Sequence, residues 1–201
     1  MATIHSLNPN FVAKYIMNRK VKFLNFFIAT LALSTLTIRS VLSQTKLTNR
    51  SKVYINGIGA VRVGMTIAEA SKAAGTKLIR ESGYETNLSC FYVKPQGEPK
   101  DMAFMVTDKR ISRVEVWEKN KSITTLSGAK IGDTEAKIKS LYPGQIQVTP
   151  HEYVKGGHYL TVVSKNASDK NYRIVFETDG KKVTRFRSGK LPEVEYVEGC
   201  S

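Results

Sequence analysis

The chain contains two similar segments of about 15 residues, and this internal repeat restricts the possible folds more than any other feature of the sequence. VRVGMTIAEASKAAG, residues 61–75, returns as AKIGDTEAKIKSLYPG, residues 129–144. Gly64 and Thr66 have counterparts 68 positions later in the chain. Sequence order that is kept at such a spacing is typical of duplicated structural units.

Both phrases predict a short helix with a defined start and end. Thr66 and Glu69 form the T-x-x-E pattern of a capping box, in which two amides at the helix start gain side-chain partners. Asp133 or Thr134 can cap the second helix. Gly75 ends the first helix, and a Pro-Gly pair ends the second.

Strand patterns follow each helix. Apolar, β-branched runs with turn residues between them predict hairpins, and these hairpins cover residues 104–116, 151–163 and 174–188. The strongest turn signal among them is Asp179-Gly180. We therefore expect an α+β fold of two tandem units, residues 44–122 and 123–201, each a short helical segment packed on an antiparallel sheet.

The same residues resemble a known group of exported proteins. The helix start GMT, residues 64–66, and strands that carry TD before ISR or VTR resemble proteins built like the β-lactamase inhibitor protein. The helix start is also similar to that of the small outer-membrane assembly lipoproteins. The tail EVEYVEGCS, residues 193–201, is similar to uncharacterised exported bacterial proteins with an EGC ending. The resemblance extends over about residues 53–198 and implies tandem α+β units in an exported protein.

The resemblance does not extend to a partner. The chain has two cysteines instead of a disulfide inside each unit, and it lacks the lipidated cysteine of the assembly lipoproteins. No binding partner of those proteins is therefore carried over to this chain.

The first 43 residues have the three parts of a secretory signal peptide. Basic residues precede an uncharged apolar stretch, residues 23–38, and Val41 and Ser43 occupy the small-residue positions of a cleavage site. The stretch is shorter than the roughly 20 residues that a spanning helix needs. We expect cleavage before Gln44 and a secreted or periplasmic protein, with an uncleaved membrane anchor as the alternative.

Both cysteines, Cys90 and Cys200, lie in the expected mature chain. In an oxidising compartment, an even pair favours a disulfide over two free thiols. The link closes a loop of about 110 residues and fastens the C-terminal tail. The sequence has no C-x-x-C motif, so neither a redox motif nor a zinc knuckle competes with the disulfide.

The net charge of the mature chain indicates the sign of the charge that its partners carry. The leader holds five of the 31 Lys and Arg and none of the 17 Asp and Glu, so the remaining 158 residues carry a formal charge of +9. Positive charge favours an acidic protein or an anionic envelope component, including a membrane surface. Nucleic acid is not expected, because the chain has an export signal and no aromatic-basic recognition motif.

The candidate motifs for cofactor and metal chemistry are incomplete. Residues 59–66 have the spacing of a phosphate-binding loop, but Met65 stands where the lysine is needed. In the predicted hairpin, which turns at residues 156–157, His151 and His158 begin about 13 Å apart, too far to share a metal ion. The sequence also lacks a G-x-S-x-G elbow. We expect no cofactor, no metal and no catalytic residues.

A basic strand face is the candidate binding site. If Val114, Val116 and Phe186 point into the core, period-two alternation directs the other side chains of these strands outward. The outward set contains the only tryptophan and consists of Arg113, Glu115, Trp117, Arg185 and Arg187. Arg and Trp are enriched where binding energy concentrates. A solvated sheet face without a function is the alternative.

We expect an exported, non-enzymatic binding protein that acts through this open sheet face on an acidic envelope or extracellular partner. An envelope-assembly scaffold is one alternative. A hydrolase is another, because Glu115, Glu152, Glu193 and Glu195 are available for the carboxylate pair that glycoside hydrolysis needs. Converging carboxylates in one cleft would favour the hydrolase, and a face with Arg and Trp would favour the binding protein.

Overall fold

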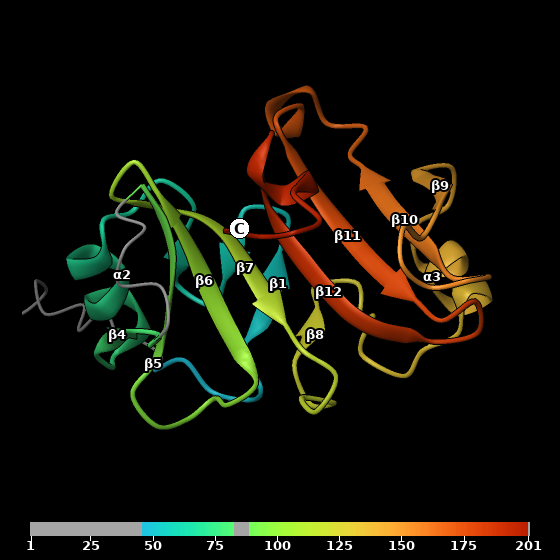
Figure 1. Cartoon of the computed structure of the whole chain (residues 1–201). Coiled ribbons are helices and arrows are strands. Elements are labelled where there is room, and N and C mark those ends of the chain that lie inside the picture. Colours follow the sequence, from blue (N-terminus) through green and yellow to red (C-terminus); the bar gives the residue numbers. More distant parts are fainter. Residues whose placement is uncertain (1–45, 83–88, 201) are drawn as a thin grey trace, which may run out of the picture. The chain divides into compact units, whose positions relative to one another are not determined.

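Strands dominate the part of the chain that the computed structural model describes, residues 46–82 and 89–200 (Figure 1). The α-helices of this part are α2 (Ile67–Ala74) and α3 (Glu135–Leu141), and its 3-10 turns are η1 (Ala167–Asp169) and η2 (Glu193–Glu195). The strands are β1 (Lys52–Tyr54), β2 (Gly57–Ile58), β3 (Val61–Arg62), β4 (Leu78–Arg80), β5 (Cys90–Pro95), β6 (Met102–Thr107), β7 (Arg110–Val116), β8 (Thr124–Thr125), β9 (Ile146–Pro150), β10 (His158–Val163), β11 (Tyr172–Thr178) and β12 (Val183–Lys190). The hairpins expected from residues 104–116 and 174–188 are present as β6–β7 and β11–β12.

Within the described residues, eight strands form one continuous antiparallel sheet in the order β4-β5-β6-β7-β12-β11-β10-β9. The first half of the chain contributes β4 to β7, and the second half contributes β9 to β12. The two sets meet where β7 pairs with β12, and Figure 1 shows these strands side by side. At this seam Glu115 lies opposite Arg187, and Arg113 lies opposite Gly189.

Gly189 permits the close approach of β7 and β12. A Cβ added at Gly189 would lie 2.5 Å from the carbonyl oxygen of Ser112 and 2.9 Å from the Cβ of Arg113. Both distances are shorter than van der Waals contact, so a residue with a side chain cannot occupy this position without moving β7.

The smaller sheet also contains strands from both halves. Its order is β3-β2-β1-β8, and β8 pairs parallel to β1. The expected fold of two helix-plus-sheet units is therefore wrong, because the described chain is mostly β and both of its sheets extend across the two halves. The physical reason is the edge strand. β7 and β12 would each leave a row of unpaired backbone groups, and pairing with each other satisfies both.

The helix starts are those that the repeated phrases predict. Thr66 caps α2 in a complete capping box with Glu69. Thr134, and not Asp133, makes the capping hydrogen bond at the start of α3. Gly75 ends α2 in the left-handed conformation, with φ of 61°.

An apolar core lies against one face of the eight-stranded sheet, which we call the inner face. Val114, Val116 and Phe186 point into it, as alternation predicts. They form one cluster with Ala70 of α2, Ile138 of α3 and side chains of the smaller sheet. Because the eight-stranded sheet continues from one half of the chain into the other, the side chains on its inner face form a single core.

The third expected hairpin is present, but its turn is longer than predicted. His158 lies opposite Pro150, so the connection between β9 and β10 spans residues 151–157 instead of a tight turn at 156–157. This longer loop carries His151 and Tyr153, which line the groove described below.

The predicted leader, residues 1–43, lies outside the described residues. In the part of the chain that the structure covers, no helix is both long enough and apolar enough to cross a membrane.

Candidate binding groove

The outer face of the eight-stranded sheet, opposite the inner face, carries the residues proposed from the sequence. Arg113 and Glu115 of β7 and Arg187 of β12 lie on it. The expectation that these three side chains are exposed is wrong, because their residues are only 1%, 3% and 2% exposed. Arg185 is exposed, and Trp117, which directly follows β7, is half-buried.

The C-terminal segment, residues 191–200, covers this part of the outer face. Val194 packs with Tyr159 and Val175, and Cys200 packs with Met105. Arg113 and Arg187 therefore lie under a segment of the same chain instead of facing solvent.

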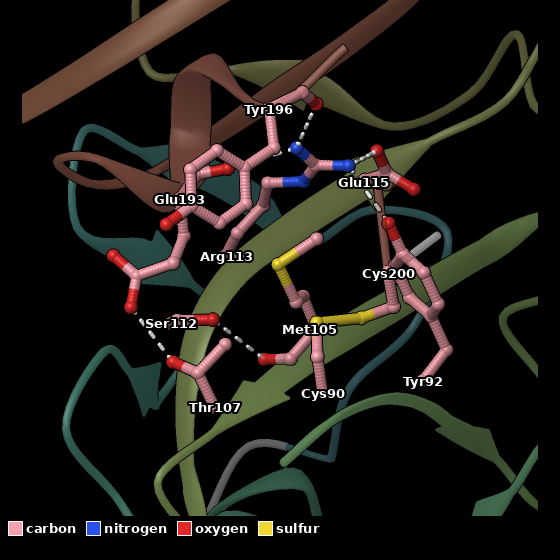
Figure 2. Close-up of a disulfide and its surroundings, with 10 residues drawn as sticks. All are labelled: Cys90, Tyr92, Met105, Thr107, Ser112, Arg113, Glu115, Glu193, Tyr196 and Cys200. Carbon is pink, nitrogen blue, oxygen red and sulfur yellow. Dashed lines mark hydrogen bonds and ion pairs between the residues drawn. A yellow bond between two sulfur atoms is a disulfide. The ribbon is translucent and has the colours of Figure 1, made fainter. Parts of the chain in front are cut away.

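The predicted disulfide fastens the C-terminal segment. Cys90, the first residue of β5, is bonded to Cys200 across a sequence separation of 110 residues (Figure 2). The predicted pairing is confirmed, and it is consistent with an oxidising compartment. The end of the chain is thus held covalently against the sheet.

Arg113 binds the main chain of the C-terminal segment (Figure 2). Its Nη1 donates to the carbonyl oxygens of Glu193 at 2.9 Å and Tyr196 at 2.7 Å. Its Nη2 donates to the hydroxyl of Tyr92 at 2.7 Å and to the carboxylate of Glu115. A buried guanidinium is tolerated because it has both a counter-ion and polar acceptors. Arg113 is therefore engaged inside the protein instead of being offered to a partner.

Arg187 makes the corresponding contacts in the second half. Its Nε donates to the carbonyl oxygen of Val194 at 2.6 Å, and its Nη1 donates to the carboxylate of Glu177. Burial lowers the pKa of the Arg187 guanidinium, and the charge of Glu177 opposes this shift. Two buried arginines, one from each half of the sheet, thus hold the segment by its carbonyl groups.

Glu193 adds a side-chain anchor at the start of η2. Its Oε1 accepts from the hydroxyl of Thr107 at 2.7 Å and lies 2.9 Å from Nζ of Lys190. Burial alone raises the pKa of Glu193, but hydrogen bonds from Lys190 and Thr107 outweigh it, and the pKa lies below its ordinary value. The carboxylate is therefore the form that fits this position.

A groove of about 540 Å³ remains open beside the C-terminal segment. This volume lies within the roughly 300–1,000 Å³ that is typical of ligand sites. The residues that line it include Trp117, Lys119, His151, Tyr153, Glu177 and Arg185. A second pocket of about 200 Å³ shares Trp117 and Arg185 with the first. We call the larger one the Trp117 groove.

The wall formed by β11 and β12 places a carboxylate between two nitrogen donors. Oε1 of Glu177 is bound by Arg187, which leaves Oε2 for the groove. Oε2 lies 3.7 Å from Nε2 of His151 and 4.0 Å from Nε of Arg185. Both separations exceed a hydrogen bond. A fixed acceptor and two donors therefore converge within ion-pair distance but without direct hydrogen bonds.

Local hydrogen bonds fix the ring of His151. Its Nδ1 accepts from the amides of Tyr153 at 3.1 Å and Val154 at 3.3 Å, so the neutral ring carries its proton on Nε2, toward Glu177. The ring also stacks on Tyr159, with centroids 4.5 Å apart. Since the lone pair of the ring is occupied by the loop, His151 offers a ligand a donor and is a poor general base.

Tyr153 gives the groove a second aromatic side chain. It is 63% exposed, and its hydroxyl donates to the carboxylate of Glu198. This hydrogen bond raises the pKa of Tyr153 to about 12, so the phenol stays neutral at physiological pH. Trp117 and Tyr153 together provide aromatic surface beside the charged groups.

Different acids line the groove from those considered in the sequence. Asp101, Glu118 and Glu177 are in its lining. Glu115 and Glu193 instead contact Arg113, through a carboxylate and a carbonyl oxygen respectively. In the described part of the chain, no group of three or more His, Cys, Asp or Glu is arranged to hold a metal ion.

Sequence reasoning identified Trp117 and Arg185 but missed Glu177 and Lys119, and it considered His151 only as a metal ligand. Glu177 lies opposite Arg185 in the β11–β12 pair, so the alternation used for β12 would have placed it on the same face. His151 gave no such signal, because it lies in a loop whose length was underestimated.

Neither a family model nor a curated protein matches this chain. Among solved structures, the chain is similar to the crystal structure of the uncharacterized protein yfeY from Escherichia coli, with a TM-score of 0.44 and 17% sequence identity. The similarity covers 69% of this chain and 99% of that chain.

Proposed function

We propose that the protein is an exported binding protein that captures a component of the cell envelope or of the surrounding medium in the Trp117 groove. One observation carries the proposal. The C-terminal segment buries the outer face around Arg113 and Arg187, yet Trp117 and Arg185 remain accessible in a groove of ligand-binding size.

The construction of the groove supports recognition. Trp and Arg carry a large share of binding energy in known interfaces. The groups around them are already ordered, since Arg187 fixes Glu177, the loop amides fix His151, and the disulfide fastens the C-terminal segment. A site that is ordered before binding loses little conformational entropy when the ligand arrives.

The contacts favour binding over hydrolysis. A general base needs a free lone pair, and Nδ1 of His151 is engaged by two amides. A general acid has to be protonated, and Glu177 is held as the counter-ion of Arg187. One observation supports the alternative function of a hydrolase: Asp101 and Glu118 line the same groove.

The charge of the chain and the charge of the groove have different consequences. The formal charge of +9 on residues 44–201 favours an acidic partner at long range. The groove itself combines Lys119 and Arg185 with Asp101 and Glu118. Long-range attraction therefore brings the protein to an acidic surface, and the groove recognises a ligand by other contacts.

Affinity capture from the native envelope tests the proposal. Tagged mature protein is cross-linked in cells, and the captured material is compared between wild type, Trp117→Ala and Arg185→Ala. Arg50→Ala is the matched control, because Arg50 is exposed and is absent from the groove lining. We expect both groove variants to lose most of the captured material and the control to retain it. Equal capture by the folded fractions of all four proteins would contradict the proposed site.

A further inference from the structure

We propose that the ligand of the Trp117 groove is a carbohydrate, recognised as neutral, hydroxyl-rich sugar rings. This inference rests on the proposed function and specifies the chemistry of the ligand. Three independent features support it, namely the charge balance of the groove, the spacing of its donors and acceptor, and its aromatic surface.

The groove is close to neutral within a strongly basic chain. Its lining has two basic side chains, Lys119 and Arg185, and three acidic ones, Asp101, Glu118 and Glu177. Arg187, buried beneath Glu177, balances the third carboxylate. An anionic ligand would meet the acids and a cationic ligand would meet the bases, so a ligand without net charge fits best.

The donors and the acceptor beside Glu177 fit a hydroxyl group. A hydroxyl donates one hydrogen bond and accepts two. A hydroxyl at this position would donate to Oε2 of Glu177 and accept from Nε2 of His151 or Nε of Arg185. These nitrogens lie 3.7 and 4.0 Å from the oxygen, too far for direct hydrogen bonds. A carboxylate ligand has no proton to give to Glu177, and a phosphate ligand would bring negative charge against that carboxylate, so neither bridges these groups as a neutral hydroxyl would.

The aromatic surface fits the other part of a sugar ring. The C–H bonds on one face of a pyranose carry partial positive charge, and the face of an indole ring carries partial negative charge. Trp117 lies in the lining of both adjoining pockets, so a chain of rings that extends from one pocket into the other would contact it. We therefore expect an oligosaccharide to bind more tightly than a single sugar.

The test uses a glycan array that contains neutral and acidic oligosaccharides, followed by calorimetry with the best-bound glycan. We expect a neutral oligosaccharide to bind, with an affinity that changes less than about twofold between low and high salt, because no net charge is neutralised. Trp117→Ala and Arg185→Met should weaken binding by at least about tenfold. Lys121→Ala is the control, since Lys121 is exposed and lies outside the groove lining. Arg185→Met keeps the test decisive if Trp117→Ala folds poorly.

The outcomes separate this inference from the proposed function. Binding of acidic glycans alone, with affinity that falls steeply as salt rises, would overturn the neutral-ligand inference. Absence of binding on the whole array would overturn it as well, and envelope capture that still depends on Trp117 would leave the binding function standing. If the wild-type protein hydrolysed the bound oligosaccharide, the result would support a carbohydrate ligand and would contradict the proposed non-enzymatic function.

Discussion

Substitution of Arg113 tests whether the outer face is buried under the C-terminal segment, because it should lower the free energy of unfolding strongly only if Arg113 and Glu115 are buried. Its side chain is 2% exposed and is paired with Glu115, whose side chain is 4% exposed. In Arg113→Met the carboxylate of Glu115 is left buried without its counter-ion, which costs about 3–5 kcal/mol in comparable cases. The carbonyl groups of Glu193 and Tyr196 also lose a charged donor, which adds to the loss. We therefore expect the free energy of unfolding to fall by about 4 kcal/mol.

A second substitution separates the buried charge from simple loss of packing. Arg113→Met combined with Glu115→Leu removes both charges, and removal of a whole buried pair is often close to neutral. We expect the double variant to recover at least about 2 kcal/mol relative to the single variant. Arg185→Met is the matched control on the same face, and because Arg185 is exposed its effect should stay within about 0.5 kcal/mol.

Urea unfolding followed by far-ultraviolet circular dichroism gives these free energies. A loss below about 1 kcal/mol in Arg113→Met would show that the pair is not buried in solution. A double variant no more stable than the single one would show that an uncompensated Glu115 is not the cause of the loss.

Further predictions concern the core, the disulfide, the acid response and the helix caps. Phe186→Ala should lower the free energy of unfolding by about 3–5 kcal/mol, measured by urea unfolding, because Phe186 is fully buried; a loss below about 1 kcal/mol would place it outside the core. The native protein should not react with thiol labels, and reduction should remove about 4–5 kcal/mol of stability; labelling without reductant would contradict the pairing. The pKa of Glu193 is lowered, so its contribution to stability is fully present above its unfolded pKa of about 4.3 and is lost as the pH falls through the lower folded value. Glu193→Gln should therefore flatten this acid limb of a stability–pH curve, and an unchanged limb would show that Glu193 does not anchor the segment. Thr66→Ala should cost about 0.5–2 kcal/mol in thermal or urea unfolding, more than Thr134→Ala, since only Thr66 belongs to a complete capping box.

Local sequence signals predicted the elements well. The T-x-x-E pattern located the start of α2, and alternation along β7 and β12 separated inner from outer residues correctly. These features depend on neighbours within a few positions of the chain, so a single sequence contains the information needed to predict them.

Long-range pairing is the part that the sequence did not reveal. Nothing in β7 specifies β12 as its neighbour, and the duplicated pattern suggested two separate sheets instead. Gly189 marks the seam, because its lack of a side chain lets β12 approach Arg113, yet an isolated glycine in a strand has several explanations.

The covering of the outer face by the C-terminal segment was not predicted, although the disulfide that holds this segment was. The disulfide was predicted, and Cys90 lies on the same strand face as Tyr92, two residues along β5. The bonded tail crosses the outer face in this structure, but the disulfide alone did not predict the covering of Arg113 and Arg187, because that covering also depends on the pairing of β7 with β12. Arg185 remains exposed because it lies beyond the part of β12 that the C-terminal segment covers.

Site-specific photo-cross-linking in the native envelope tests the central claim most directly. A benzophenone amino acid is placed at position 119, in the lining of the Trp117 groove, or at position 121, exposed but outside it. After irradiation of intact cells, adducts are detected by a shift on gels and by mass spectrometry. We predict an adduct from position 119 that is absent from position 121 and disappears when Arg185→Met is added. Adducts of equal yield at both positions, or at position 121 alone, would contradict the claim that the protein binds its ligand in this groove.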